Sequence, residues 1–398
     1  MSSQEGPGEV AQLAGERAFT RSAVPAIAMY CLDQDRLTTA SLGIYNYTQN
    51  LILSLAQLED PGVRLILWLA EANASDFCPV PTPSWISVRC LKGRYGRGIR
   101  RIWADQILAP YLALRDRVQA VHFPKGWTPM LRPRTLKIVT TLHDTIVQYY
   151  QHRYPGVFPK SKLWYLDLQA RHALRCANRI LTPSRFSAGE LAKLVPASSG
   201  RLCVVSTGGI REAPRQSPDR RNGLLVMGSR LPHKRTAETL RLLDGYAQLQ
   251  GVRLAVTVTG LKKWEDIVPS LPPPASLQVE FLGTLPAASL AEKLTSHRAL
   301  VLLSEIEGFG LPALEAYSAG TPVCYRSTTS LAEVMDGLPG GWDGRSPETF
   351  ARAMDEVLSL TPPQIESLRT GLLQRYRWTE SVQKTMAIYK ELLATDCA

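Results

Sequence analysis

The sequence predicts an α/β protein with two facing Rossmann-like domains, each built on a parallel sheet, and a functional cleft between them. Three observations lead to this class. The chain has 398 residues, which is more than one hydrophobic core normally serves. Short apolar runs alternate with helix-length amphipathic segments, as in βαβ units. A polar stretch rich in Pro and Arg, 211–223, separates two such arrays and is typical of a linker.

Nine short apolar runs are the predicted strands. They lie at 26–32, 63–69, 120–124, 137–144 and 179–184 in the first half, and at 223–229, 253–260, 277–283 and 299–304 in the second. The last long segment, 362–394, has a helical pattern.

Five segments follow from this order: a disordered tail, a first domain, a linker, a second domain, and a C-terminal helix that packs back on the first domain. Their predicted boundaries are 1–22, 23–210, 211–222, 223–375 and 376–398. Because ligands of doubly wound domains bind beyond the carboxyl ends of the strands, candidate functional residues are expected there.

Composition narrows the class of protein further. Seven cysteines are scattered and form no C-x-x-C pair, which disfavours a disulfide framework and a zinc site, so a reducing cytoplasm is expected. The first 22 residues do not resemble a secretory signal. The longest apolar runs, such as 23–32, reach about half of the ~20 residues of a membrane span, so none is expected to cross a bilayer.

Most of the net charge of +11 lies in one window, 89–137, which holds twelve Lys or Arg against Asp105 and Asp116. Its segment 94–112 is a basic amphipathic helix by pattern. Such a helix could rest on an anionic membrane or bind a phosphorylated acceptor. The same pattern is also typical of a core helix with a solvated basic face, and all three interpretations stay open. Nucleic acid fits poorly, since no binding module accompanies the charge. The candidate contact residues are Arg94, Arg97, Arg100, Arg101 and Trp103.

The stretch SEIEGFGLPALEA, 304–316, sets two carboxylates around a glycine turn. Glu307 is expected in the loop and Glu315 in the first turn of the following helix. The amides of Phe309, Gly310 and Leu311 would then lie at the helix N-terminus, which favours oxygen-rich ligands. From spacing alone, ligand binding and simple helix capping by Glu315 are equally compatible with this pattern.

A second candidate is GLLVMGSRLPHKR, 223–235, in which a strand ends at a glycine turn and cations follow at once. Arg230 and Lys234 at a strand end suit a diphosphate, because Arg engages two oxygens and Lys adds a point charge. A solvated basic loop is the alternative. Two weaker candidates lie in the first half: His143 beside Asp144 at the end of an apolar strand, and Gly43 just before an amphipathic helix, where amides could approach a phosphate.

Taken together, these motifs resemble the retaining glycosyltransferases of family 4, which have the GT-B architecture. The resemblance runs from about residue 24 to 393 and is most specific at EGFGLPALEA, the family's E-x7-E signature. In family order come GIYNYTQNLILSL, LHDT, ILTPSRFSAGEL and GSRLPHKR, the last resembling an Arg-x3-Lys phosphate clamp.

The resemblance implies roles for these positions. Glu307 would hold the donor sugar with the turn Gly308, Phe309, Gly310 and Leu311, and Glu315 the ribose of the nucleotide. Arg230 and Lys234, next to Ser229, would neutralise the leaving diphosphate in place of a metal. The remaining implied contacts are His143 to the donor sugar, Gly43 to the phosphates, and the weaker candidates Ser330 and Glu333 near the nucleotide.

The implied activity is retaining, metal-independent transfer of a hexose, mannose or a related deoxyhexose, from a GDP-, UDP- or dTDP-sugar. The acceptor would be a glycan or glycolipid of cell-surface polysaccharide, such as lipopolysaccharide, and the enzyme would work in the cytoplasm or peripherally at the inner face of the plasma membrane. No cofactor is expected beyond the nucleotide sugar. Two alternatives are a glycoside hydrolase using Glu307 and Glu315 and a non-catalytic basic scaffold that binds nucleotide sugars.

Three positions depart from the family pattern. The chain has STGGI at 206–210 where relatives often read Asn-Gly-Val-Asp, Arg235 where Asn commonly follows the clamp lysine, and Leu303 where Pro is frequent. None removes a proposed catalytic group, but they leave loop geometry and donor choice open.

Overall fold

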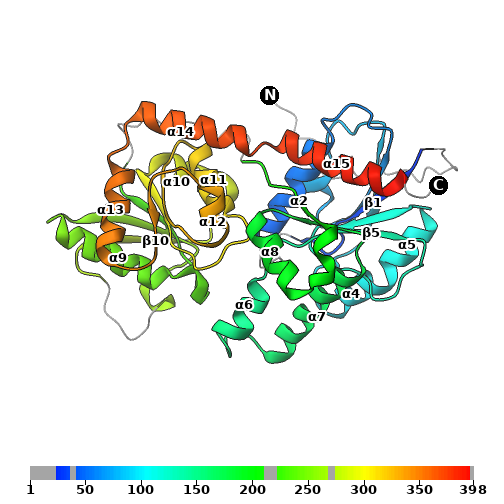
Figure 1. Ribbon diagram of the computed structural model, residues 1–398, viewed down its shortest axis with the longest axis horizontal. Coiled ribbons are helices and arrows are strands. Elements are labelled where there is room, and N and C mark those ends of the chain that lie inside the picture. Colours follow the sequence, from blue (N-terminus) through cyan, green and yellow to red (C-terminus); the bar gives the residue numbers. More distant parts are fainter. Residues whose placement is uncertain (1–23, 36–41, 210–221, 268–273, 395–398) are drawn as a thin grey trace, which may run out of the picture.

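The computed structural model describes residues 24–35, 42–209, 222–267 and 274–394. The predicted tail over 1–22 and all but residue 222 of the predicted linker lie outside these residues. Figure 1 shows two lobes, each with a sheet between helices, and a helical segment that runs over both.

The first lobe is built on a seven-stranded parallel sheet with the order β3-β2-β1-β4-β5-β6-β7. Its strands are β1 (Ala26–Tyr30), β2 (Arg64–Ala70), β3 (Ile86–Leu91), β4 (Ala120–Phe123), β5 (Lys137–Thr141), β6 (Arg179–Thr182) and β7 (Leu202–Val204). Its helical segments are α2 (Leu42–Leu55), α3 (Ala74–Phe77), α4 (Gly98–Trp103), the π-helical η1 (Ala104–Leu108), α5 (Ala109–Arg115), α6 (Ile146–Arg153), α7 (Lys160–Cys176), α8 (Arg185–Leu194) and η2 (Pro196–Arg201).

The second lobe has a six-stranded parallel sheet with the order β10-β9-β8-β11-β12-β13. Its strands are β8 (Leu224–Met227), β9 (Leu254–Thr259), β10 (Leu277–Gly283), β11 (Ala299–Leu302), β12 (Val323–Arg326) and β13 (Gly341–Trp342). Its helical segments are η4 (Pro232–Lys234), α9 (Thr236–Leu249), η5 (Trp264–Asp266), α10 (Ala287–Ser296), α11 (Leu311–Ser318), α12 (Thr329–Val334), α13 (Pro347–Leu358) and α14 (Pro362–Arg375).

Helices cover both faces of the first sheet, which explains why its strands are continuous apolar runs. In β1 the side chains of Ile27 and Met29 enter a core under α2, whereas those of Ala28 and Tyr30 enter a second core under η1 and α5. Strands buried on both faces cannot alternate apolar and polar residues. All nine predicted strands form, and the predicted class of two parallel-sheet domains is confirmed.

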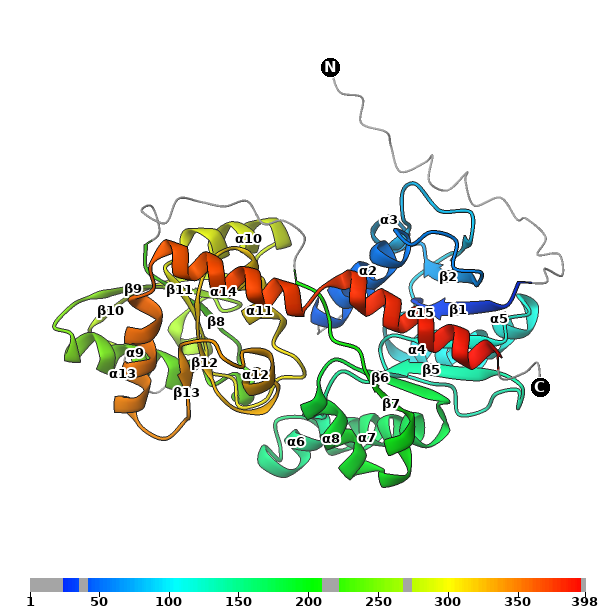
Figure 2. The ribbon, with the colours of Figure 1, turned by 45° about the horizontal axis from the view of Figure 1, so that its top comes forward.

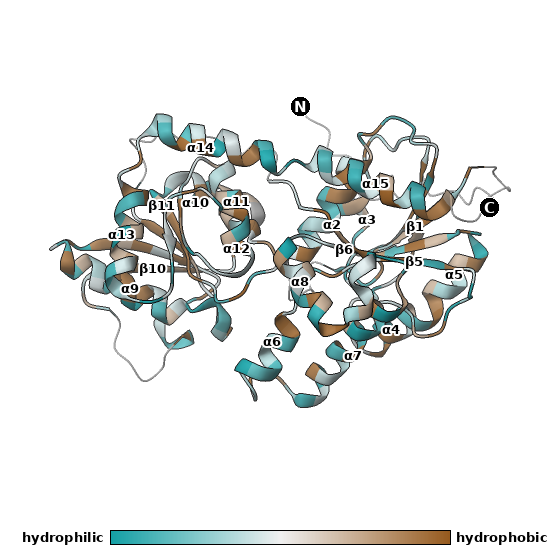
Figure 3. Cartoon of the chain, viewed as in Figure 1, coloured by the Kyte–Doolittle hydropathy of each residue, from teal (hydrophilic) through white to brown (hydrophobic). Residues whose placement is uncertain are grey.

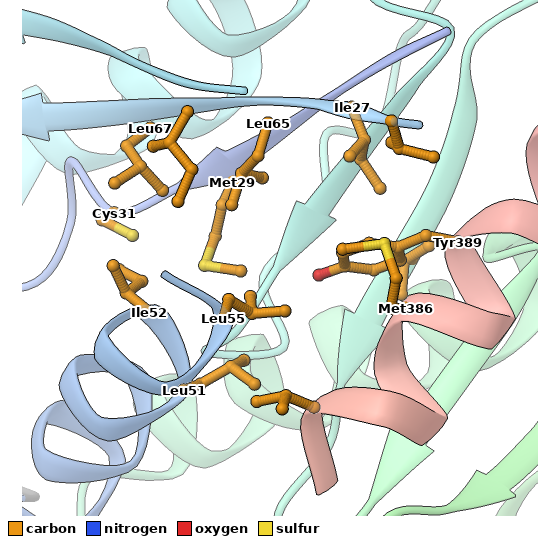
Figure 4. Close-up of a cluster of buried hydrophobic side chains, with 14 of the residues drawn as sticks. Ile27, Met29, Cys31, Leu51, Ile52, Leu55, Leu65, Leu67, Met386 and Tyr389 are labelled. Carbon is orange, nitrogen blue, oxygen red and sulfur yellow. The ribbon is translucent and has the colours of Figure 1, made fainter. Parts of the chain in front are cut away.

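The chain ends by returning to the first lobe through α15 (Trp378–Ala394). Figure 2 shows α14 on the second lobe running on into α15 on the first. Figure 4 shows why α15 stays there: Met386 and Tyr389 point into the same core as Ile27, Leu51 and Leu65. The two lobes are therefore tied at a second place besides the connection near residue 210.

Across the described residues, no helix combines the length and the apolar character that crossing a bilayer requires.

Candidate active site

The two motifs of the second domain leave neighbouring strands at the same edge of the sheet. Strands β8 and β11 pair in parallel, with Val226 opposite Val301. The chain continues from one into Arg230 and Lys234, and from the other into the glycine turn. Strand order reverses between these two strands, because β9 and β12 lie on opposite sides of them. A topological switch point of this kind is where open α/β sheets bind ligands.

Lys234 and Glu307 form a direct ion pair in which Nζ lies 2.6 Å from Oε1. The carboxylate is buried, with 8% of the residue exposed. Burial alone would raise the pKa of Glu307, but the ammonium group of Lys234 outweighs it, with a smaller contribution from His233, and the pKa lies below its ordinary value. Glu307 is therefore ionised at neutral pH and is not a proton donor.

Glu315 is in the opposite situation. Burial raises the pKa of its carboxyl group to about 7, and no nearby charge acts on it. Among the described residues no hydrogen bond or ion pair to this side chain is found. The glycine Gly310, with φ of 96°, is the N-cap of α11, so the first turn begins at Leu311 and contains no acidic residue. The prediction that Glu315 lies in the first turn is thus wrong, and capping by Glu315 is excluded.

Glycines shape the turn that carries these groups. Gly310 adopts a left-handed conformation that other residues rarely take. A β-carbon on Gly308 would lie 2.4 Å from the backbone oxygen of His143, so only glycine permits this approach of the two domains. The N-cap glycine offers no side chain to the amides of the first turn of α11. Of the predicted amide contacts, Leu311 lies in this first turn, whereas Phe309 precedes the N-cap.

Arg230 is the exposed member of the predicted clamp. Its guanidinium donates to Oδ1 of Asp266 over 2.7 Å, and 72% of the side chain is exposed. To bind a diphosphate, it must share or leave this carboxylate. Ser229 accepts a hydrogen bond from the amide of Leu231, and Thr236 accepts one from the amide of Ser229, so this turn is fixed by its own hydrogen bonds.

His143 lies at the end of β5 in the first domain. Burial lowers the pKa of its imidazole to about 4, so the ring is neutral at pH 7. Nε2 lies 2.8 Å from the carbonyl oxygen of Pro124. A carbonyl only accepts, so Nε2 carries the proton and Nδ1 is left as an acceptor. The edge of Tyr47 packs against the ring at 4.7 Å between centroids.

The first domain also holds the glycine turn through hydroxyl groups that sequence reasoning did not single out. Ser184 and Ser187 donate to the carbonyl of Gly308 over 2.8 and 2.9 Å. Ser184 at the same time caps α8 by accepting from the amide of Ser187. The Pro-Ser segment was recognised in the family order, but its partner lies more than 120 residues away in the sequence. No local pattern could identify that contact.

Ser330 and Glu333, the weaker candidates for nucleotide contacts, both make contacts within the protein. The buried hydroxyl of Ser330 donates to the backbone oxygen of Glu307 over 2.7 Å, so it orients the glycine turn. The carboxylate of Glu333 accepts from the amides of Arg185 and Phe186 at the start of α8. In this state Glu333 binds a helix N-terminus of the other domain, which is an anion site by its dipole.

A second interdomain contact was not predicted. Glu305 accepts hydrogen bonds from the hydroxyls of Tyr149 and Tyr154, and it pairs with Arg235 at 3.3 Å. Next to it, the hydroxyl of Tyr150 lies 2.7 Å from Nδ1 of His233. Through these hydrogen bonds, α6 and the residue that follows it hold the loop that carries Arg230 and Lys234.

The remaining predicted residues are spread over the first domain. Gly43 lies inside α2 and is exposed, so the prediction that it precedes the helix is wrong. Arg101 is turned inward: it lies 3.7 Å from Asp33 and 3.5 Å from Asp105, and it stacks on Trp127. Arg101 is therefore not a surface contact, because these partners occupy its guanidinium. The other members of the predicted basic contact are on the surface, namely Arg94, Arg97, Arg100 and Trp103.

Two departures from the family pattern have a structural explanation. Arg235 has φ of 52°, a left-handed conformation in which Asn is favoured, and here Glu238 and Glu305 hold its side chain. Gly208 lies against Trp378, where a β-carbon would come within 2.5 Å of the tryptophan amide. Gly208 thus provides the space that Trp378 occupies where the chain crosses back to the first domain.

Within the described ranges, no three His, Cys, Asp or Glu side chains are grouped closely enough to hold a metal ion.

Comparison with known proteins defines the class. Residues 43–208 match the model of Glycosyltransferase Family 4, and residues 211–369 match that of Glycosyl transferases group 1. Together the two matches cover most of the chain and meet where the two domains meet. The chain belongs to the family 4 type of glycosyltransferases.

Relatives and solved structures agree with this assignment. The chain is 27% identical over 303 residues, 70% of this chain and 76% of the relative, to O-antigen chain mannosyltransferase B of Escherichia coli. It is 27% identical to D-inositol 3-phosphate glycosyltransferase of Mycolicibacterium smegmatis, over 85% of this chain and 84% of that one.

Among solved structures, sucrose-phosphate synthase of Thermosynechococcus elongatus superposes with a TM-score of 0.65 at 16% identity, over 93% of this chain and 100% of that one. Anabaena HepE, solved with UDP and glucose, gives 0.62 at 15% identity over 92% and 100% of the two chains. At such identities the likeness establishes the fold alone, which is GT-B.

Proposed function

We propose that the protein transfers a hexose, mannose or a related deoxyhexose, from a nucleoside-diphosphate sugar to a glycan or glycolipid acceptor, with retention of configuration. The observation that carries this proposal is the ion pair between Lys234 and the buried Glu307 at the glycine turn. The carboxyl group of Glu315 follows in α11, and no partner for it is found among the described residues. An ionised carboxylate suits sugar hydroxyls, and the cation beside it suits a diphosphate. Glu315 would accept from the ribose hydroxyls.

The proposed transfer step is the same-face attack that the family resemblance suggests. The bond from the anomeric carbon to the diphosphate oxygen breaks, and the bond to the acceptor oxygen forms on the same face. The acceptor's proton passes to the leaving phosphate, so no protein nucleophile is needed. Arg230 and Lys234 stabilise the negative charge that develops on the phosphate, which is the largest catalytic term in reactions of this type. Neutral His143, through Nδ1, would accept from a hydroxyl of the donor sugar.

The sugar and the acceptor are inferred from relatives. Two of them are named O-antigen chain mannosyltransferase B and serotype-specific mannosyltransferase WbdA. These names favour mannose and a cell-surface polysaccharide, and we propose GDP as the nucleotide. We further propose that the reaction takes place in the cytoplasm or at the inner face of the plasma membrane and that it needs no metal.

The first experiment identifies the donor. The protein is incubated with GDP-, UDP- and dTDP-sugars and a panel of glycan acceptors, with and without EDTA, and product mass and anomeric configuration are read by mass spectrometry and NMR. We expect an α-linked product from an α-configured donor such as GDP-mannose, undiminished by EDTA. If none of the donors yields product across the acceptors, the proposal is wrong.

The second experiment tests the site. Arg230→Ala and Lys234→Ala should each lower kcat by a factor of about 10² to 10³, as loss of one charge-stabilising group does in other enzymes. Arg345→Ala is the matched control, because Arg345 is 85% exposed in the same domain and pairs only loosely, at 3.5 Å, with Asp343. Equal rates in the clamp variants and the control would contradict the assignment.

The glycosidase alternative has one observation in its favour, since the pKa values of Glu307 and Glu315 are displaced in opposite directions, as in an acid and nucleophile pair. The ion pair with Lys234 and the family membership speak against it. Cleavage of a glycan by water without nucleotide would support this alternative, and nucleotide binding without turnover would support a scaffold.

A further inference from the structure

One helical segment of the first domain exposes a row of large apolar side chains. It consists of α4, η1 and α5, which follow one another without a break from Gly98 to Arg115. Six of its side chains are exposed, with the exposed fraction of each residue as follows: Ile99 83%, Ile102 45%, Trp103 48%, Ile107 59%, Tyr111 56% and Leu114 64%. Few monomeric proteins leave such a contiguous apolar row open to water without a function.

The row is fixed in place by the opposite face of the same helix. Ala104, Leu108 and Leu112 are buried in the core under β1, so the segment cannot rotate to bury the exposed side chains instead. In an α-helix, side chains four residues apart drift by about 40° per step. Trp103 lies directly before the π turn of η1 and Ile107 lies within it, and the wider turn counters this drift. Figure 3 shows hydrophobic and hydrophilic residues side by side along α4 and α5.

The exposed charges of the 89–137 window have one sign. Exposed basic side chains accompany the apolar row, namely Lys92, Arg94, Arg97, Arg100, Arg115 and Arg117. The two acidic residues of the 89–137 window face inward: Asp105 is 1% exposed and accepts from Tyr30, and Asp116 is 0% exposed and accepts from Trp68. Both acidic side chains of this window are therefore buried, and its exposed charged side chains are all basic.

We propose that the segment Gly98–Arg115 is an interfacial helix that rests on an anionic lipid bilayer. An apolar row with a tryptophan and flanking arginines is the pattern of helices that lie in the plane of a membrane. The complementary charge is that of anionic headgroups, to which each nearby Lys or Arg contributes. The helix is held by the domain core, so the protein would dock without unfolding. This inference does not require the proposed transfer reaction.

The test uses the full chain and vesicles without any substrate. The protein is sedimented with vesicles of phosphatidylcholine, either pure or mixed equally with phosphatidylglycerol, at low and high salt. We expect binding to the anionic vesicles that weakens with salt, and at least tenfold weaker binding to neutral ones. Ile99→Ser/Ile107→Ser should lower the partition coefficient at least tenfold. Lys92→Gln/Arg100→Gln should lower it about fivefold for each charge removed.

Matched controls lie elsewhere on the molecule. Lys384→Gln/Lys390→Gln removes two exposed charges from α15, which covers the opposite face of the first sheet, and Leu249→Ser removes a 69% exposed leucine from the second domain. Both controls should bind like the wild type, and all variants should keep the wild-type circular dichroism spectrum. The proposal is overturned if the wild type stays in the supernatant at low salt, or if the isoleucine variant sediments like the controls. Light scattering is used to compare the oligomeric state of the wild type and the variants. If the wild type is a dimer and a variant is a monomer, the apolar row is a contact between two copies, and the proposal is overturned.

Discussion

Glu315→Gln tests the most unusual electrostatic feature of the site. Burial raises the pKa of this carboxyl group from an ordinary 4.5 to about 7. The folded state therefore holds the proton more tightly than the unfolded state does. Between about pH 4.5 and 7 the stability of the wild type falls as pH rises, and the full penalty is present above pH 7. At 1.36 kcal/mol per pKa unit the penalty is about 3 kcal/mol.

The glutamine variant lacks this titration. Urea denaturation should show that it is more stable than the wild type by up to about 3 kcal/mol at pH 8 and nearly equal to it at pH 4.5. Glu292→Gln is the control, since Glu292 is exposed on α10 in the same domain. Nucleoside diphosphate should bind the wild type more tightly at pH 8 than at pH 5, because ribose hydroxyls donate to the carboxylate, and should bind the variant weakly at both. Parallel stability curves for wild type and variant would refute the reasoning.

Two further predictions concern the first domain. Burial lowers the pKa of His122 to about 3 and that of His143 to about 4. Both residues therefore contribute stability above pH 6.5 that is lost progressively on acidification towards pH 4. His122→Asn should flatten this part of the plot of urea midpoint against pH, and an unchanged slope would contradict the assignment. Glu333→Gln removes the negative charge at the N-terminus of α8, and combined with Ser187→Ala it should weaken the contact between the first domain and the glycine turn. Small-angle scattering should then show a larger radius of gyration. An unchanged radius together with unchanged kinetics would show that these contacts do not hold the domains closed.

The sequence analysis missed four strands, β3, β7, β12 and β13, and two of them, β3 and β13, show the physical reason. Strand β3 lies at an edge and is only partly buried, so its residues carry no continuous apolar signal. Strand β13 has two residues and exists because it pairs with Tyr325 and Arg326 of β12. Short edge strands of this kind are stabilised by the neighbour they pair with, which lies outside any local window.

The site was predictable where its residues are close in sequence. The glycine turn with Glu307 and the clamp with Lys234 each follow a strand directly, and parallel strands end at one edge of the sheet. The interdomain contacts were not predictable, because the hydroxyls of Ser184 and Ser187 reach Gly308 only once both domains have folded. The ion pair of Arg101 with Asp33 was not predictable either, because Asp33 lies far away in the sequence.

The sequence by itself therefore determined the class of fold, nine of its strands and the family. These properties rest on apolar runs, on glycine turns and on motifs that are local in the chain. Only the tertiary structure decided that Lys234 pairs with Glu307, that Glu315 lies beyond the first turn of α11, and that Asp105 and Asp116 turn inward. Burial and pairing are properties of neighbours in space, and those neighbours set the charge state of each group.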